Sequence, residues 1–300
     1  MNLKSLVNVM LIGLLFGGGI VSSRFGIGQF EPIVFTGLRL AVAVLAFAGF
    51  YLVSHQRHPF PSNWRLWRHS LLLGTFGTAL PMTCFIAALQ FQSSGVSAIF
   101  ITTGPAMIAL LAHFALPDES LNRVKVSGIV LALGGALFIA LNGESGLRDF
   151  PQANPLGYIL ITLSVSCHCV ATIYLRKYTH QYRTFDLTGS QILIAMVFIL
   201  LGASLTMGFD FSRVDLTGLM SLLYSGLFGT FIAFLLYNLT VRDFGPTVAG
   251  MSFYVTPIVA TLAGVLLLGE ALTLNIVIGM SVILAGIALV NYGSRARTLA

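Results

Sequence analysis

Charged residues are scarce in this sequence. Asp, Glu, Lys and Arg together make up 9% of its 300 residues, whereas a soluble domain carries about 25%. Apolar residues account for 56%, and the mean hydropathy is +0.90. This balance excludes a water-soluble globular protein and predicts a chain that lies mostly in lipid.

Cysteine is also rare, and the three that occur are Cys84, Cys167 and Cys169. All three lie inside apolar runs and their spacing matches no metal motif, so we expect small packing residues rather than disulfides or ligands. His168 lies between two of them, but successive residues of a helix point about 100° apart. The trio cannot hold one metal ion, and we expect neither a metal nor a cofactor.

Acidic residues are absent from the middle of every apolar run, because all ten fall near run ends or between runs. A proton-coupled exporter of cationic drugs is expected to place a carboxylate at the membrane midplane. A carrier of phosphates or nucleotide sugars should show several deep cations, and only Arg39 lies well inside a run. Both absences favour a neutral or zwitterionic solute, such as an amino acid.

Ten apolar runs are each long enough to cross a bilayer, which takes about 20 residues of helix. They fall near residues 6–26, 32–53, 68–90, 94–115, 123–142, 155–177, 184–207, 216–239, 245–268 and 273–292. The connections between them are short and leave no room for a soluble domain. The sequence therefore predicts an all-α integral membrane protein with ten transmembrane helices.

Basic residues predict the orientation of these helices, because short loops rich in Lys and Arg stay in the cytoplasm. With the N-terminus inside, twelve basic residues fall on the inner side: Lys4, Arg57, Arg65, Arg68, Arg123, Lys125, Arg176, Lys177, Arg183, Arg242, Arg295 and Arg297. Only Arg24, Arg148 and Arg213 fall on the outer side. We therefore expect both termini in the cytoplasm. Topology explains the net charge of +6, so we expect no nucleic-acid partner.

The sequence repeats itself at an offset of 152 residues. The matched pairs include Gly74 and Gly226, Thr78 and Thr230, Pro105 and Pro257, Arg39 and Gln191, and Asp118 and Glu270. Each half has five helices, and because five is odd the halves must cross the membrane in opposite directions. We expect two inverted five-helix repeats, residues 1–147 and 148–300, with a solute site near the midplane where they meet.

Several longer motifs occur in a fixed order. The first half carries GTFGTALPMTCFIAAL and GPAMIALLAHFALPDE, and the second half closes with YVTPIVATLAGVLLLGEALT. Their order and duplication resemble the drug/metabolite transporter superfamily, in particular its ten-helix EamA-type permeases, over nearly the whole chain. The resemblance implies a permease of the inner membrane that moves small metabolites, often outward. It also implies a central cavity lined by helices 1, 3, 4, 6, 8 and 9.

Pro105 and Pro257 lie near the middle of the fourth and ninth runs. A proline inside a helix leaves the carbonyl four residues back without its donor, here those of Ile101 and Phe253. In lipid such a carbonyl must face protein, water or solute. The duplication favours a kink that gates the pathway and offers a polar spot to solute. A kink that serves only packing is the alternative.

Polar and aromatic side chains near these prolines are the candidate lining, because solute sites are mostly apolar with a few placed polar groups. Besides Ile101 and Phe253, the candidates are Thr78, Met82, Phe85, Thr102, His168, Tyr237, Asn238 and Tyr254. Tyr237, Asn238 and Tyr254 are favoured, since a hydroxyl or amide needs a partner. Contact with lipid or with a neighbouring helix is the alternative for the phenylalanines.

Arg39 and its equivalent Gln191 are polar residues inside the membrane. Arg39 lies about 10 Å deep, at 1.5 Å per residue past Pro32. It either contacts a solute carboxylate or gate, or it is a structural arginine bonded to backbone carbonyls, and the neutral Gln191 favours the structural role. His168 either relays a proton or is a hydrogen-bonded core histidine, and the core role is favoured.

These features predict a secondary transporter that exports amino acids or similar metabolites by alternating access, with solute and lipid as its partners. Alternatives are a carrier of other metabolites or drugs, and a lipid- or glycan-handling flippase of the same fold. An intramembrane enzyme would need a nucleophile–base pair, and His168 has no acid partner, so we expect no enzyme. Glycines of the fifth and tenth runs are compatible with a monomer or a homodimer, because small residues allow close helix contact.

Overall fold

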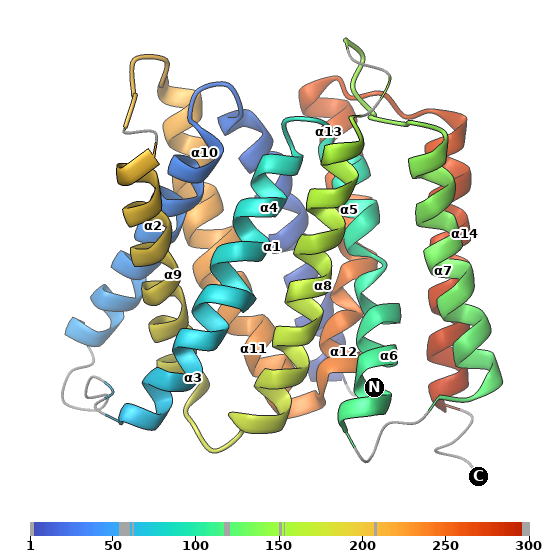
Figure 1. Ribbon diagram of the computed structural model, residues 1–300, viewed down its shortest axis with the longest axis horizontal. Coiled ribbons are helices and arrows are strands. Elements are labelled where there is room, and N and C mark those ends of the chain that lie inside the picture. Colours follow the sequence, from blue (N-terminus) through green and yellow to red (C-terminus); the bar gives the residue numbers. More distant parts are fainter. Residues whose placement is uncertain are drawn as a thin grey trace.

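The computed structural model describes residues 3–53, 61, 63–116, 121–149, 152, 154–206 and 209–295. Regular secondary structure in these residues is helical, and two isolated bridges join Ile27 to Phe30 and Glu144 to Gln152. The helices stand side by side and most of them run between the same two ends of the molecule (Figure 1).

Each repeat contains five crossings, two of which are interrupted. The first repeat consists of α1 (Leu3–Gly26), α2 (Pro32–Val53), α3 (Trp64–Gly74), η1 (Thr75–Ala79), α4 (Leu80–Ala88), α5 (Ser94–Ile101), α6 (Gly104–Ala115) and α7 (Arg123–Leu141). The second consists of α8 (Pro155–Tyr178), α9 (Thr184–Thr206), α10 (Leu216–Gly226), η2 (Leu227–Ile232), α11 (Ala233–Phe244), α12 (Pro246–Gly250), α13 (Ser252–Leu268) and α14 (Leu274–Arg295).

In the described part of the chain, nine crossings are long and apolar enough to span a bilayer by length and composition. The tenth, α14, contributes a shorter apolar stretch, Leu274–Val290. The predicted all-α membrane fold with ten helices is confirmed. The third helix starts earlier than predicted because Asn63 caps it, its side chain accepting from the backbone N–H of Arg65 at 2.9 Å.

The two repeats run in opposite directions. Figure 1 shows α1 rising from the lower end of the molecule, whereas its equivalent α8 descends from the upper end. The first residue of α1 and the last of α14 therefore lie at the same end (Figure 1). This arrangement is the inverted repeat that the odd number of helices predicts. The boundary after residue 147 stays a prediction.

A π-helical segment interrupts the third helix of each repeat at the matched glycine motif. Gly74 precedes η1 and Gly226 precedes η2. A Cβ atom on Gly74 would lie 2.8 Å from the carbonyl oxygen of Gln191, and one on Gly226 would lie 2.9 Å from that of Arg39. Because these glycines lack side chains, the backbone of Gln191 packs against the start of η1 and the backbone of Arg39 packs against the start of η2. Each of the two residues thus contacts the π segment of the other repeat.

The fourth and ninth helices are broken, but not in the same way. In the first repeat α5 ends at Ile101, and α6 begins with Pro105 in its first turn. In the second repeat the break falls at Met251, and Pro257 lies inside the continuous helix α13. Proline therefore starts a helix in one repeat, where its missing N–H is not needed, and interrupts helix bonding in the other.

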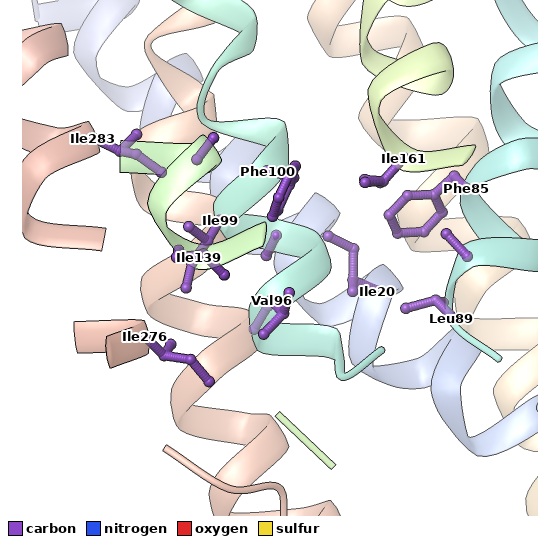
Figure 2. Close-up of a cluster of buried hydrophobic side chains, with 14 of the residues drawn as sticks. Ile20, Phe85, Leu89, Val96, Ile99, Phe100, Ile139, Ile161, Ile276 and Ile283 are labelled. Atoms are coloured by element: carbon purple, nitrogen blue, oxygen red, sulfur yellow. The ribbon is translucent and has the colours of Figure 1, made fainter. Parts of the chain in front are cut away.

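The helices α7 and α14 form a close pair at one side of the molecule (Figure 1). A Cβ atom on Gly128 would lie 2.5 Å from the carbonyl oxygen of Gly286, and one on Gly135 would lie 2.9 Å from that of Gly279. These glycines therefore serve packing within the chain. Figure 2 shows the apolar cluster that joins this pair, through Ile139 and the residues of α14, to α5.

Candidate functional site

A cavity of about 110 Å³ lies between the two repeats. Its lining comes from α1, α2, η1, α4, α5, α8, α11 and α13, which are parts of seven different crossings. The lining residues are Phe16, Ile20, Arg39, Gly77, Thr78, Pro81, Met82, Phe85, Ile101, Ser164, Val165, His168, Cys169, Phe234, Phe253 and Thr256. Most of these are apolar, which is typical of a small-molecule site.

Equivalent positions of the two repeats line this cavity. The 152-residue offset pairs Phe16 with His168, Met82 with Phe234, and Ile101 with Phe253, and all six line it. The site is therefore built from the same positions of both inverted halves. Such an arrangement is typical of secondary transporters whose solute site lies at the repeat interface.

Six of the predicted lining residues line the cavity: Thr78, Met82, Phe85, Ile101, His168 and Phe253. Arg39 lines it as well. The other predicted residues lie outside the lining: Thr102, Tyr237, Asn238, Tyr254, Gln191, Pro105 and Pro257. The structure thus divides the candidate residues into those that line the cavity and those that do not, and their role in a solute site stays a prediction.

Tyr237 lies behind the lining. Its ring stacks on Phe253 with 5.7 Å between centroids, and its hydroxyl lies 3.1 Å from Thr172 Oγ1. Asn238 donates to Thr188 Oγ1 at 3.0 Å. The side-chain hydroxyl of Thr102 donates to the carbonyl of Ile99 in its own helix. These polar groups find their partners within the protein rather than in the cavity.

Sequence reasoning missed Phe16 and Ser164, and it did not single out Phe234 from its neighbours. Phe16 and Phe234 are the repeat equivalents of His168 and Met82, both of which were predicted. The 152-residue offset, applied to each candidate, would have identified them. Ser164 donates to the carbonyl of Pro81 at 2.6 Å, a contact between helices that has no such signal.

Arg39 is buried and bonded entirely to neutral groups. Its Nε donates to Thr230 Oγ1 at 2.7 Å, and its terminal nitrogens donate to Ser23 Oγ at 2.8 Å and to the carbonyl of Gly229 at 3.0 Å. The partners lie on α1 and η2. Arg39 therefore joins helices of both repeats at the wall of the cavity.

Gln191 makes the equivalent contact in the other half. Its Nε2 donates to Thr78 Oγ1 at 2.7 Å, and Thr78 is the repeat equivalent of Thr230. Its Oε1 lies 3.5 Å from Nδ2 of Asn238. The two halves thus share one bonding pattern, in which a long side chain reaches the threonine of the opposite π segment. The first half places a cation there and the second a neutral amide.

An aromatic cluster within the second repeat surrounds His168. The ring centroids of Tyr237, Phe253 and Phe234 lie 5.2, 5.7 and 6.4 Å from that of His168. Nε2 of His168 is buried and has no hydrogen-bond partner among the described residues. His168 also lines the cavity. This ring nitrogen is a buried polar atom of the described lining that no hydrogen bond satisfies.

Glu270 caps α5 across the repeat interface. One carboxylate oxygen accepts from the backbone N–H of Ser94 at 2.8 Å, and the other accepts from the Ser94 hydroxyl at 2.6 Å and from the N–H of Gly95 at 3.2 Å. A carboxylate is favourable at a helix N-terminus, where partial positive charge accumulates. Glu270 thus has a structural role away from the cavity. Its equivalent Asp118 lies outside the described residues.

Both halves of the sequence match the model of the EamA-like transporter family, over residues 3–141 and 155–292. The chain belongs to this family. As an EamA-like protein it is a multi-pass membrane transporter, and the two matched segments correspond to the two five-helix halves of the fold.

Several relatives of this EamA-like chain are named transporters. It is 22% identical to the uncharacterized transporter YoaV of Bacillus subtilis strain 168, with 95% of each chain covered. It is 24% identical to an uncharacterized transporter of Archaeoglobus fulgidus, over 96% of this chain and 99% of that one. It is 27% identical to the uncharacterized inner membrane transporter YedA of Escherichia coli K12, over 93% and 88%. These names point to a transporter rather than an enzyme.

A solved crystal structure shares the fold of this EamA-like protein. It matches with a TM-score of 0.72 and covers 99% of both chains, at 18% sequence identity. The match confirms the arrangement of helices along the whole length of the chain. At this identity it carries no information on the solute.

Proposed function

We propose that this transporter moves small neutral or zwitterionic metabolites, amino acids foremost, out of the cytoplasm by alternating access. The observation that carries the proposal is the cavity between the inverted repeats, whose lining comes from equivalent positions of both halves. Because the halves are inverted, an exchange of their conformations would open the same site first to one side and then to the other.

The size of the cavity supports a small solute. Its volume of about 110 Å³ is below the roughly 150 Å³ of an engineered cavity that binds benzene. Hydroxyl groups of Thr78, Ser164 and Thr256 lie among mainly apolar walls. This lining suits a solute with an apolar body and few polar groups, such as an amino acid with a small side chain.

The broken helices supply the proposed gates. The break between α5 and α6 directly follows Ile101, a lining residue, and Pro257 lies four residues past Phe253, another. We propose that Pro105 and Pro257 act as hinges: Pro105 starts α6 directly after the gap in helix bonding, and Pro257 removes a helix bond inside α13. Twelve basic residues fall on the side of the two termini and three fall on the opposite side. This distribution supports a protein of the cytoplasmic membrane with both termini in the cytoplasm.

Transport by the purified full chain in proteoliposomes tests the proposal. We expect saturable counterflow of one or more small amino acids, measured over a panel with and without a pH gradient, and none in protein-free vesicles. The pH arm reports proton coupling. If no amino acid moves or competes, the amino-acid proposal fails. Movement of labelled lipid alone would favour a flippase of the same fold.

A further inference from the structure

The guanidinium of Arg39 keeps two N–H groups without an acceptor. It carries five N–H groups, and three of them donate to Thr230, Ser23 and Gly229. One N–H on each terminal nitrogen therefore has no acceptor among the described residues. A carboxylate that pairs with an arginine through two parallel bonds needs two such groups.

The charge of Arg39 is also unbalanced. The residue is 4% exposed, and its hydroxyl partners are neutral, because Ser23 donates onward to the carbonyl of Gly19 at 2.6 Å and Thr230 to that of Ser225 at 2.8 Å. In the described part of the chain, no Asp or Glu lines the cavity or pairs with this arginine. A buried cation without a counter-charge is costly, so a bound anion would stabilise it.

The guanidinium lies where α1 packs closely against η2, since a Cβ atom on Gly19 or Gly229 would lie 3.0 Å from the Cα atom of the other glycine. A Cβ atom on Gly229 would lie 3.1 Å from a terminal nitrogen of Arg39, and one on Gly19 would lie 3.6 Å from the same atom. Both glycines belong to the helices that hold the arginine. A side chain at either position would crowd the nitrogen that still has an N–H to donate.

An ammonium group finds no carboxylate partner among the described residues that line this cavity. The polar groups among the described lining residues, apart from Arg39, are neutral: the hydroxyls of Thr78, Ser164 and Thr256, the thiol of Cys169 and the ring of His168. The ammonium group of an amino acid can donate hydrogen bonds to these neutral groups. No described lining residue, however, needs an ammonium group as its partner. The apolar and aromatic walls suit the rest of the solute.

We propose that Arg39 is the residue that selects the solute, and that it does so by binding a carboxylate. This inference rests on the proposed function and redefines its solute class as small apolar molecules that carry a carboxylate, which include zwitterionic amino acids and simple carboxylate anions. The carboxylate is essential for binding, and the ammonium group is dispensable.

Binding of four related molecules to the purified full chain in detergent, measured by isothermal titration calorimetry, tests this directly. The molecules are alanine, its deaminated analogue propionate, its decarboxylated analogue ethylamine and the neutral propionamide, all of them small enough for the cavity. We expect both acids to bind at least tenfold more tightly than the amine and the amide. Equal binding of the amine or the amide, or no binding of either acid, would overturn the inference.

Arg39→Gln provides the matching variant, because Gln191 already occupies the equivalent position and reaches the equivalent threonine. We expect it to lower the affinity for both acids at least tenfold while the protein remains folded. Arg213→Gln is the control, since it removes the same charge from an exposed outer loop and should leave both affinities unchanged. Unchanged binding in Arg39→Gln would also overturn the inference.

The two proposals fail separately. Binding of acids that requires Arg39, without any counterflow in proteoliposomes, would refute transport and leave carboxylate recognition intact. Counterflow of alanine that survives in Arg39→Gln would refute the role of Arg39 and leave the proposed function intact. If Arg39→Gln does not fold, the comparison of the four molecules on the unaltered protein still tests whether binding requires the carboxylate, and equal binding of the amine or the amide would overturn the inference.

Discussion

His168 brings a buried ring nitrogen to the cavity wall without giving it a partner. An unsatisfied buried polar group costs about 1–3 kcal/mol. Its repeat equivalent, Phe16, fills the corresponding place with a hydrocarbon ring. Phenylalanine would fit this place without the energetic cost of the unsatisfied nitrogen. We therefore expect His168 to contribute to the site, by accepting a hydrogen bond from the solute or donating one to it.

His168→Phe tests this role. We expect the thermal unfolding midpoint in detergent to stay the same or rise, because the variant removes the unsatisfied nitrogen and keeps an aromatic ring. Counterflow should fall several-fold, because the solute loses a polar contact. Ser166→Ala on the same helix is the control, since that hydroxyl is bonded to its own helix. Normal counterflow in His168→Phe would place the nitrogen outside the solute site.

Among the helices, the α7–α14 pair depends on the absence of side chains at its contact. Gly128 has no space for a Cβ atom, whereas Gly134, one and a half turns further along the same helix, has no neighbouring atom within 4 Å of one. A change of glycine to alanine at each position therefore distinguishes two effects on stability. At Gly128 it tests the packing of α7 against α14, and at Gly134 it tests only the helix propensity of the residue.

Gly128→Ala should destabilise the protein by about 1–3 kcal/mol, because it forces the backbones of α7 and α14 apart. Gly134→Ala should be neutral or stabilising by up to about 1 kcal/mol, since alanine favours helix over glycine. Unfolding midpoints in detergent measure both effects. Equal midpoints for the two variants would mean that the helices are not packed as described.

Pro257 lies inside α13, where it interrupts the bonding of a helix that supplies two lining residues, Phe253 and Thr256. Pro257→Ala restores a backbone donor for the carbonyl of Phe253 and should stiffen the helix. We expect slower counterflow with normal expression and membrane insertion. Pro155→Ala is the control, because proline in the first turn of a helix costs no hydrogen bond. Unchanged counterflow would show that Pro257 has only a packing role.

For the whole molecule, the distribution of basic residues predicts which end faces the cytoplasm. Single cysteines introduced into a cysteine-free chain test this. A membrane-impermeant maleimide should label Ser212→Cys, between α9 and α10, in intact cells. It should label His180→Cys, between α8 and α9, only after the cells are permeabilised. The opposite pattern would reverse the proposed orientation.

The sequence predicted the fold because its strongest signals are global ones: long apolar runs, the charge of the loops and a duplication. It could not predict which face of each helix meets the cavity, because lipid-facing and core-facing positions are both apolar in a membrane protein. Phe234 and Tyr237 illustrate this, since they lie three residues apart on α11 and only Phe234 lines the cavity. The π segment η2 also rotates the residues that follow it about the helix axis, so that they lie on other faces of the helix than a regular α-helix would give. The residue pattern did not predict this rotation.

The unequal bonding of Arg39 and Gln191 has an energetic consequence for the resting protein. Two identical inverted repeats would make the outward-open and inward-open states equal in free energy, because each state becomes the other when the halves exchange roles. Here one half carries a cation and breaks its helix after Ile101, whereas the other carries an amide and breaks its helix at Met251. Under the proposed alternating access we therefore expect the empty carrier to favour one side of the membrane, so that the solute gradient acts on top of this difference in free energy.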